Sequence, residues 1–513
     1  MEHAARLEKV IVSLIVGAFI LAGSPRAIAC SDDCTSLLEK AQALLTQEQV
    51  PEARDVILTV VRECPQNAQA YNLLGISYDE QSLYKEAEAA YQKAISLNPG
   101  WAAFHNNLAV SYYRAGGTAN AIEEFRKAIR LDPHNQFAAV NLAKYYVDQR
   151  EYRQALDYFQ IADVATSHDP ALLLELAKAY FGAGMEEAAL QTISSLNRLG
   201  GTDAKLHFSA GLLLAENGQY AAAVKQFETI PASDRDFAVN QNLGLAYSKL
   251  GRFAEAQTAY RNALRLEPSN PEPYLGMGQD FSAMYQFDRA VDWLSQAHER
   301  SPKREDITCA LAEALIQGRQ FDRAHDLLSD ALKYRPHDPA FLKSLGDLYS
   351  HQGQNQLAIK AYQESLSYAP KRFEAHLALA QLYQGLGRVS EAKAELDQVL
   401  RIATDNSEAN ATLGRIALQA GQIGIALDNL KKALRVDPNN LNANEDLATI
   451  QLRQGSSVEA QAVLEKLVGL NPNNPRFHYL LGQALLKSGR KEEAQREFTR
   501  SQELVSARAK AIM

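Results

Sequence analysis

Residues 68–101 have the sequence AQAYNLLGISYDEQSLYKEAEAAYQKAISLNPGW, and residues 102–135 repeat its pattern as AAFHNNLAVSYYRAGGTANAIEEFRKAIRLDPHN. Each stretch has a small residue at position 8, alanine at position 20, an aromatic residue at position 24 and proline at position 32. A pattern that recurs every 34 residues indicates an array of similar units rather than one ordinary globular domain.

The pattern continues in phase along almost the whole chain. Fourteen units begin at residues 34, 68, 102, 136, 170, 204, 237, 271, 305, 339, 373, 407, 441 and 475. They fill residues 34–506, after a short segment at 30–33 and before a tail at 507–513. Only the step from 204 to 237 is 33 residues long instead of 34. The chain is therefore predicted to contain this array and no separate domain.

Three positions of the unit predict its structure. Position 8 is glycine or alanine in all fourteen units, position 20 is always alanine, and position 24 is always large and apolar. Repeat positions 7, 8 and 11 are spaced so that they lie on one face of a helix, and so are positions 20, 24 and 27. Two small residues twelve places apart indicate two helices that cross at close approach. Glycine at position 15 suits the end of the first helix, and proline at position 32 ends the second.

These residues resemble the tetratricopeptide repeat, a helix–turn–helix unit with the signature W-x2-L-G-x2-Y followed by an alanine, an aromatic residue and a proline. The matching residues in the second unit are Tyr71, Leu74, Gly75, Tyr78, Ala87, Tyr91 and Pro99, with tyrosine in place of tryptophan. The resemblance implies an all-α fold, a right-handed α-solenoid superhelix of about fourteen units. It also implies that the first helices line a concave groove.

The same resemblance implies that positions 2, 5, 6, 9, 12 and 13 face the groove. The candidate partner-binding residues at these positions are Asn72, Asn106, Asn107, Asn141, Lys144, Lys178, Gln241 and Asn242. An asparagine amide both donates to and accepts from a peptide main chain. In some long members of the family, an asparagine ladder on the inner face holds an extended polypeptide.

Three interpretations of these polar residues stay open. Asn107 and Asn141 resemble two steps of an asparagine ladder. Asn141, Lys144 and Lys178 partly resemble a carboxylate clamp, but the full set of that motif is not in register. The third interpretation is that they are ordinary solvated polar residues.

The linkers after the fourth, fifth and sixth units lack the proline at position 32, where Ser167, Gly201 and Arg235 stand instead. Solenoid units contact only their neighbours, so a weak linker concentrates flexibility locally. One hypothesis is that residues 163–236 form a bend between two stiffer blocks. The alternative is sequence drift with unchanged geometry.

The first 29 residues differ from the repeats. Arg6 and Lys9 precede an apolar run at residues 10–23, and Ala27-Ile28-Ala29 follows it. This pattern is typical of a secretory signal peptide, and the run is too short for the ~20 residues of a spanning helix. We therefore expect an exported protein, periplasmic or secreted, with no membrane span after removal of residues 1–29. An uncleaved anchor and a lipid attached to Cys30 are alternatives.

Export makes disulfides possible. Cys34 begins the first predicted hairpin and Cys64 ends it, so an antiparallel helix pair would bring them together. A Cys30–Cys64 bond and two unpaired cysteines are the alternatives. Cys309 lies alone on a predicted helix, where we expect a packed, unreactive thiol.

Composition and motifs favour binding over catalysis. The net charge of −8 is spread along the chain, which argues against a nucleic-acid partner. The sequence contains no phosphate loop, zinc-protease or serine-hydrolase motif. The eleven histidines are scattered, so we expect no metal site, no cofactor and no enzymatic activity. The sequence predicts a scaffold that binds other proteins, as extended peptides or domains, in envelope assembly, secretion or polysaccharide export. A non-catalytic subunit of an enzyme complex and a lipid-anchored scaffold are alternatives, and self-association is left open.

Overall fold

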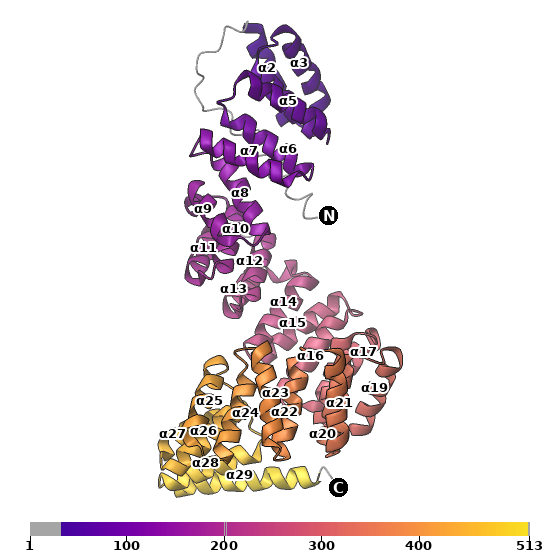
Figure 1. Cartoon of the computed structure of the whole chain (residues 1–513), viewed down its shortest axis with the longest axis vertical. Coiled ribbons are helices and arrows are strands. Elements are labelled where there is room, and N and C mark those ends of the chain that lie inside the picture. The colour runs from indigo at the N-terminus through magenta and orange to yellow at the C-terminus, as the bar shows by residue number, and fades with distance from the viewer. Residues whose placement is uncertain (1–31, 200, 202, 511–513) are drawn as a thin grey trace. The chain divides into compact units, whose positions relative to one another are not determined.

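A computed structural model describes residues 32–199, 201 and 203–510, and every regular element in these ranges is a helix (Figure 1). The helices α2 to α29 form fourteen consecutive hairpins, so the predicted all-α solenoid of helix–turn–helix units is confirmed. The predicted signal peptide and Cys30 lie outside the described residues. None of the described helices is both long and apolar enough to cross a membrane.

The chain divides into two compact blocks, residues 1–234 and 235–513, which are described separately. The boundary falls inside the range 163–236, for which the sequence suggested a bend. The helices of the N-terminal block are α2 (Asp32–Thr46), α3 (Val50–Glu63), α4 (Ala68–Asp79), α5 (Tyr84–Leu97), α6 (Ala102–Arg114), α7 (Thr118–Leu131), α8 (Gln136–Asp148), α9 (Tyr152–Ile161), η2 (Val164–Thr166), α10 (Pro170–Gly182), α11 (Glu186–Leu199), α12 (Ala204–Glu216), α13 (Tyr220–Thr229) and η3 (Ala232–Asp234).

The C-terminal block consists of eight further hairpins. Its helices are α14 (Phe237–Lys249), α15 (Phe253–Leu266), α16 (Pro271–Ala283), α17 (Phe287–Arg300), α18 (Glu305–Gln317), α19 (Phe321–Tyr334), α20 (Pro339–His351), α21 (Asn355–Tyr368), α22 (Phe373–Gly385), α23 (Val389–Ile402), α24 (Ser407–Gln419), α25 (Ile423–Val436), α26 (Leu441–Gln454), α27 (Ser457–Leu470), α28 (Pro475–Lys487) and α29 (Lys491–Lys510). The last helix continues into the predicted tail as far as Lys510.

Helix starts follow local capping signals. From α4 onward, the first helix of each hairpin begins at the residue where the repeat begins. The residue before it is often asparagine or aspartate; Asn67, for example, accepts a hydrogen bond from the Ala70 amide at 3.0 Å. Pro170, Pro271, Pro339 and Pro475 occupy the first turn, where a missing amide proton costs nothing.

The turn after the first helix has the same backbone conformation in every unit. Position 15 has a positive φ in all fourteen units, whether it is glycine, such as Gly353 at 74°, or another residue, such as Ser82 at 58°. Elsewhere in the described chain, only Asp163, at 49°, and Gly201, at 56°, have a positive φ. Asp163 therefore marks a local departure from the repeat.

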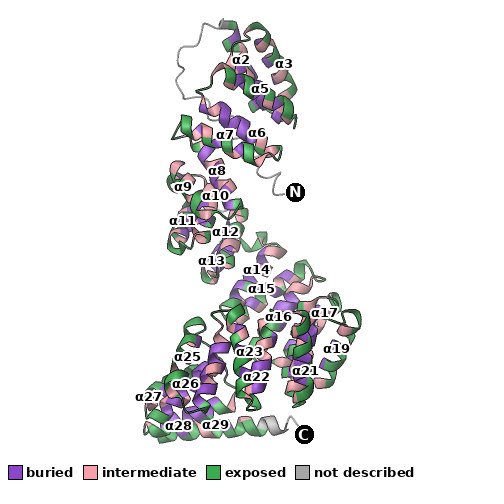
Figure 2. Ribbon diagram, viewed as in Figure 1, coloured by how far each residue is buried: buried purple, intermediate pink, exposed green. Residues whose placement is uncertain are grey.

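The hairpins pack a small residue of the first helix against a large one of the second. A Cβ added to Gly211 would lie 2.4 Å from the Phe227 ring, which is fully buried. Tyrosine at position 24 always faces glycine at position 8, as in the Gly346–Tyr362 pair, where the corresponding distance is 2.5 Å. Buried and exposed stretches accordingly alternate along the helices (Figure 2).

A disulfide joins Cys34 on α2 to Cys64, the residue after α3, with 6.8 Å between their Cα atoms. It closes the first hairpin at the ends where its helices begin and finish. Cys309 packs against the core of its hairpin, and burial raises the pKa of its thiol to about 11.

Candidate functional site

A pocket of about 260 Å³ lies in the N-terminal block on the first helices of the third, fourth and fifth repeat units. We call it the unit-4 pocket. Its lining residues are Asn106, Gln136, Phe137, Val140, Asn141, Lys144, Ala162, Asp163, Val164, Thr166, Ser167 and Leu172. It contains three of the residues predicted from the sequence, Asn106, Asn141 and Lys144.

An irregular linker forms one wall of this pocket. α9 has 10 residues, whereas the second helix of the preceding unit, α7, has 14, so α9 ends about one turn early. The backbone then passes through the left-handed conformation of Asp163 into the short helix η2. The Thr166 hydroxyl donates to the Asp163 carboxylate at 2.7 Å and holds this turn. Val164 is buried beneath it.

The polar lining has unused hydrogen-bonding capacity. Asn106 is 6% exposed, and its Oδ1 is buried without a partner in the structure. The side chains of Asn141 and Lys144 form no hydrogen bond or ion pair with any described residue. A buried acceptor without a donor costs ~1–3 kcal/mol of folding free energy. Phe137, Val140 and Leu172 provide the apolar lining.

Lys144 is a partly buried cation. Burial lowers the pKa of its ammonium group, while the negative charges of Glu175, Asp169 and Asp148 oppose that shift. None of these carboxylates lies within ion-pair distance of its Nζ. Lys144 therefore carries a desolvation cost that these more distant charges offset only in part.

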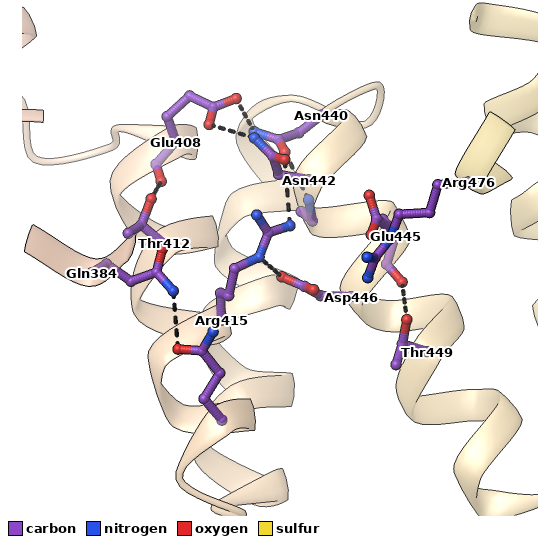
Figure 3. A network of polar contacts seen from close by, with 12 residues as sticks. Gln384, Glu408, Thr412, Arg415, Asn440, Asn442, Glu445, Asp446, Thr449 and Arg476 are labelled. Atoms are coloured by element: carbon purple, nitrogen blue, oxygen red, sulfur yellow. Dashed lines mark hydrogen bonds and ion pairs between the residues drawn. The ribbon is translucent and has the colours of Figure 1, made fainter. Parts of the chain in front are cut away.

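One residue at the equivalent repeat position in the C-terminal block, Arg415, is paired within the chain (Figure 3). Arg415 occupies the same repeat position as Lys144, and its Nε donates to Asp446 on the next first helix at 2.9 Å. Glu175 stands at the same sequence separation from Lys144 as Asp446 from Arg415, yet no ion pair forms there. Arg476 and Glu445 continue the network to α28. These polar residues of α24, α26 and α28 thus hold repeat units together, whereas the polar residues of the unit-4 pocket are free to bind a ligand.

The other candidate residues lie elsewhere. Asn107 donates to Asn72 Oδ1 at 2.9 Å, and both side chains are buried between α4 and α6, 4% and 0% exposed. Lys178 is exposed on α10 and does not line the pocket. Asn242, in the C-terminal block, donates to the Ala238 carbonyl of its own helix at 2.8 Å. Its neighbour Gln241 has a buried Oε1 without a partner.

Histidines at position 4 have a structural role. His105, His376 and His478 each contact the glutamate at position 23 of the same unit through Nδ1 at 2.6 Å, and His207 contacts Gln226 at 2.9 Å. These contacts tie the first helix of the unit to the second. In the part of the chain that the structure describes, no group of three or more histidine, cysteine or acidic side chains could hold a metal ion.

Sequence reasoning missed the apolar half of the pocket. Phe137, Val140 and Leu172 look like ordinary packing residues of amphipathic helices. The available signal was the missing proline at Ser167, which indicated an irregular linker but not the pocket beside it.

Comparisons with known proteins identify the repeat. Sequence models described as tetratricopeptide repeat match residues 38–100, 74–136, 309–373 and 411–475, and, for a second model, 349–416 and 452–504. A third, described as TPR repeat, matches residues 244–282. Cell division cycle protein 16 homologs of Homo sapiens and Mus musculus are 34% identical over 97 residues, which cover 17% of this chain and 16% of theirs. The chain therefore matches about a sixth of the length of these relatives.

The solved structures that match this chain are distant in sequence. A tetratricopeptide repeat protein from Parabacteroides merdae has a TM-score of 0.42 and 17% identity, over 48% of this chain and 97% of that one. The Cut9–Hcn1 hetero-tetramer of APC/C has a TM-score of 0.38 and 15% identity, over 88% and 97%. The structure of Naa15/Naa10 bound to HypK-THB has a TM-score of 0.35 and 18% identity, over 93% and 76%.

Proposed function

The chain belongs to the tetratricopeptide repeat family, whose repeats form protein–protein interaction scaffolds, and from that premise we propose that its first helices bind partner polypeptides at the unit-4 pocket. The observation that carries this proposal is the unpaired set of Asn106, Asn141 and Lys144 beside an apolar wall. Arg415, at the same repeat position as Lys144, is by contrast already paired within the chain. We propose that binding at this surface, without catalysis by the chain itself, is its function.

We further propose that the protein works outside the cytoplasm. The sequence of residues 1–29 supports export, and the Cys34–Cys64 disulfide is the kind of bond that persists in an oxidising compartment. Protein isolated from its own cells under acid quench, then alkylated, tests this. Mass spectrometry should find mature chains that begin after residue 29 and whose Cys34 and Cys64 resist alkylation until reduction. Reduced cysteines in a chain that keeps residues 1–29 would contradict export.

Affinity capture tests the binding function. The full chain with a C-terminal tag is expressed in its own cells, and captured polypeptides are quantified by mass spectrometry. Leu172→Trp fills the pocket, and Arg153→Ala changes an exposed residue on α9 outside it. We expect a set of polypeptides that the parent and Arg153→Ala capture and that Leu172→Trp loses. Equal capture by all three, with unchanged thermal unfolding, would contradict binding at this pocket.

A further inference from the structure

Resting on the proposed function, we propose that the unit-4 pocket takes one aromatic side chain from an internal, non-acidic segment of extended polypeptide, and that Asn106, Asn141 and Lys144 hold the main chain of that segment. This assigns the pocket a specificity for the partner sequence. It also distinguishes the site from a clamp for a terminal carboxylate.

The size and lining of the pocket fit an aromatic anchor. Phe137, Val140 and Leu172 supply apolar surface from two first helices, and the buried Val164 adds to it from the linker. An engineered apolar cavity of about 150 Å³ binds benzene, so 260 Å³ admits the ring of a phenylalanine or tyrosine with part of its main chain. Full burial of such a side chain contributes ~1.5–3 kcal/mol.

The unpaired polar groups match a peptide main chain. Asn106 Oδ1 is enclosed by the protein, so the Nδ2 amide of this side chain, which has no partner among the described residues, is the group that donates to a ligand carbonyl oxygen. The Lys144 ammonium and the Asn141 amide can donate to ligand carbonyl oxygens. Main-chain groups are the same in every internal segment, so these three residues give affinity while the pocket gives sequence preference.

The surrounding charge disfavours an acidic ligand. Asp163 lines the pocket, and Glu175, Asp169 and Asp148 act electrostatically on Lys144. These four carboxylates, set against one partly buried lysine, repel a ligand carboxylate, although a neutral carbonyl avoids this repulsion. Residues flanking the aromatic anchor are therefore expected to be neutral or basic.

A peptide selection tests this inference. Random dodecamers, displayed between fixed flanks so that neither end is free, are selected on the full chain. The strongest peptide is then synthesised with both ends blocked, and its binding is measured by fluorescence anisotropy. We expect an enriched aromatic residue with acidic residues depleted beside it. Replacing the aromatic residue by alanine, or a neighbour by aspartate, should weaken binding about tenfold and several-fold respectively.

Matched protein variants locate the binding. Lys144→Met should weaken binding of the selected peptide about tenfold, because a hydrogen bond to a charged donor is lost. Lys178→Met, at the same repeat position one unit further on, should change it less than about twofold. Leu172→Trp should abolish it. Each variant is first checked for unchanged circular dichroism and thermal unfolding.

Results that overturn this inference can be told apart from results that overturn the proposed function. Selected peptides rich in acidic residues, or bound equally well by Leu172→Trp, would overturn the inference. A selection that enriches nothing would also overturn it. In either case the scaffold function still stands if affinity capture by the full chain remains sensitive to Leu172→Trp, and falls if capture is insensitive.

Discussion

Asn107 and Asn141 occupy the same repeat position, but their surroundings give them different roles. Asn107 donates to Asn72 in a site where both side chains are buried. Asn141 lines the unit-4 pocket with its hydrogen-bonding groups unused. From sequence alone, both were candidate partner-binding residues.

Alanine variants should separate these two roles. Asn107→Ala leaves the Asn72 amide oxygen buried without its donor, so we expect a loss of ~1–3 kcal/mol in the free energy of unfolding. Asn141→Ala should change that free energy by less than ~0.5 kcal/mol and weaken peptide binding instead. Urea denaturation followed by circular dichroism measures both. Equal destabilisation by the two changes would contradict the assignment.

Asp79 is a buried carboxyl group in the N-terminal block. Its Oδ2 accepts from the Tyr91 hydroxyl at 2.8 Å, and its Oδ1 accepts from Ser111 at 2.6 Å. Burial raises its pKa to about 6, against the lowering effect of these hydroxyls and of Arg114. In the C-terminal block, burial likewise raises the pKa of Asp280 to about 6.

Stability should therefore depend on pH. A carboxyl group whose folded pKa lies above its unfolded value stabilises the fold below about pH 4, and this contribution is lost as pH rises through about 6. The effect is on the order of 1–3 kcal/mol. Asp79→Asn should flatten the pH dependence of the N-terminal block between pH 4 and 7, and Asp280→Asn that of the C-terminal block, as followed by hydrogen exchange. A variant with the pH dependence of the parent would contradict this account.

Each helix hairpin packs a small residue at position 8 against a large apolar residue at position 24. Gly211 lies against Phe227 with no room for a Cβ. The ninth and eleventh units use a different combination, Ala312 with Leu328 and Ala380 with Leu396. The same hairpin packing is therefore achieved in this chain by an alanine–leucine pair as well as by a glycine–phenylalanine pair.

Converting the glycine–phenylalanine pair into an alanine–leucine pair tests this packing with two variants. Gly211→Ala should cost ~1–3 kcal/mol, because the added methyl group overlaps the Phe227 ring. Adding Phe227→Leu should recover part of that loss by recreating the alanine–leucine pair. Urea denaturation measures the single and double variants. Additive destabilisation would show that the two positions do not compensate each other.

Sequence reasoning was strongest where the repeat is regular. The unit boundaries, and the turn at position 15 where that residue is glycine, follow from residues visible in the sequence. The pocket could not be predicted, because it depends on α9 ending early at Asp163, a non-glycine residue in the left-handed conformation. The side-chain pairing could not be predicted from the sequence either, because Lys144 and Arg415 share a repeat position but only Arg415 has a partner.

The chain consists of two compact blocks, and units of a solenoid contact mainly their neighbours. Ala290 is fully buried in the C-terminal block. Ala290→Leu should overpack its hairpin and lower the free energy of unfolding by ~1–3 kcal/mol. Hydrogen exchange with mass spectrometry should then show faster exchange in residues 235–513 and unchanged exchange in residues 32–199. Faster exchange across both blocks would mean that the array unfolds as one cooperative unit.

The proposal that polypeptides bind at the unit-4 pocket is tested most directly by photo-crosslinking at two sites. A photoreactive amino acid replaces either Gln136, exposed at the rim of the pocket, or Arg153, exposed on α9 of the same unit. Both proteins are irradiated in their own cells, and crosslinked products are identified by mass spectrometry. The account predicts crosslinks from position 136 to a small set of other polypeptides and few from position 153. Equal crosslinking from both positions, or crosslinks only between copies of this chain, would contradict it.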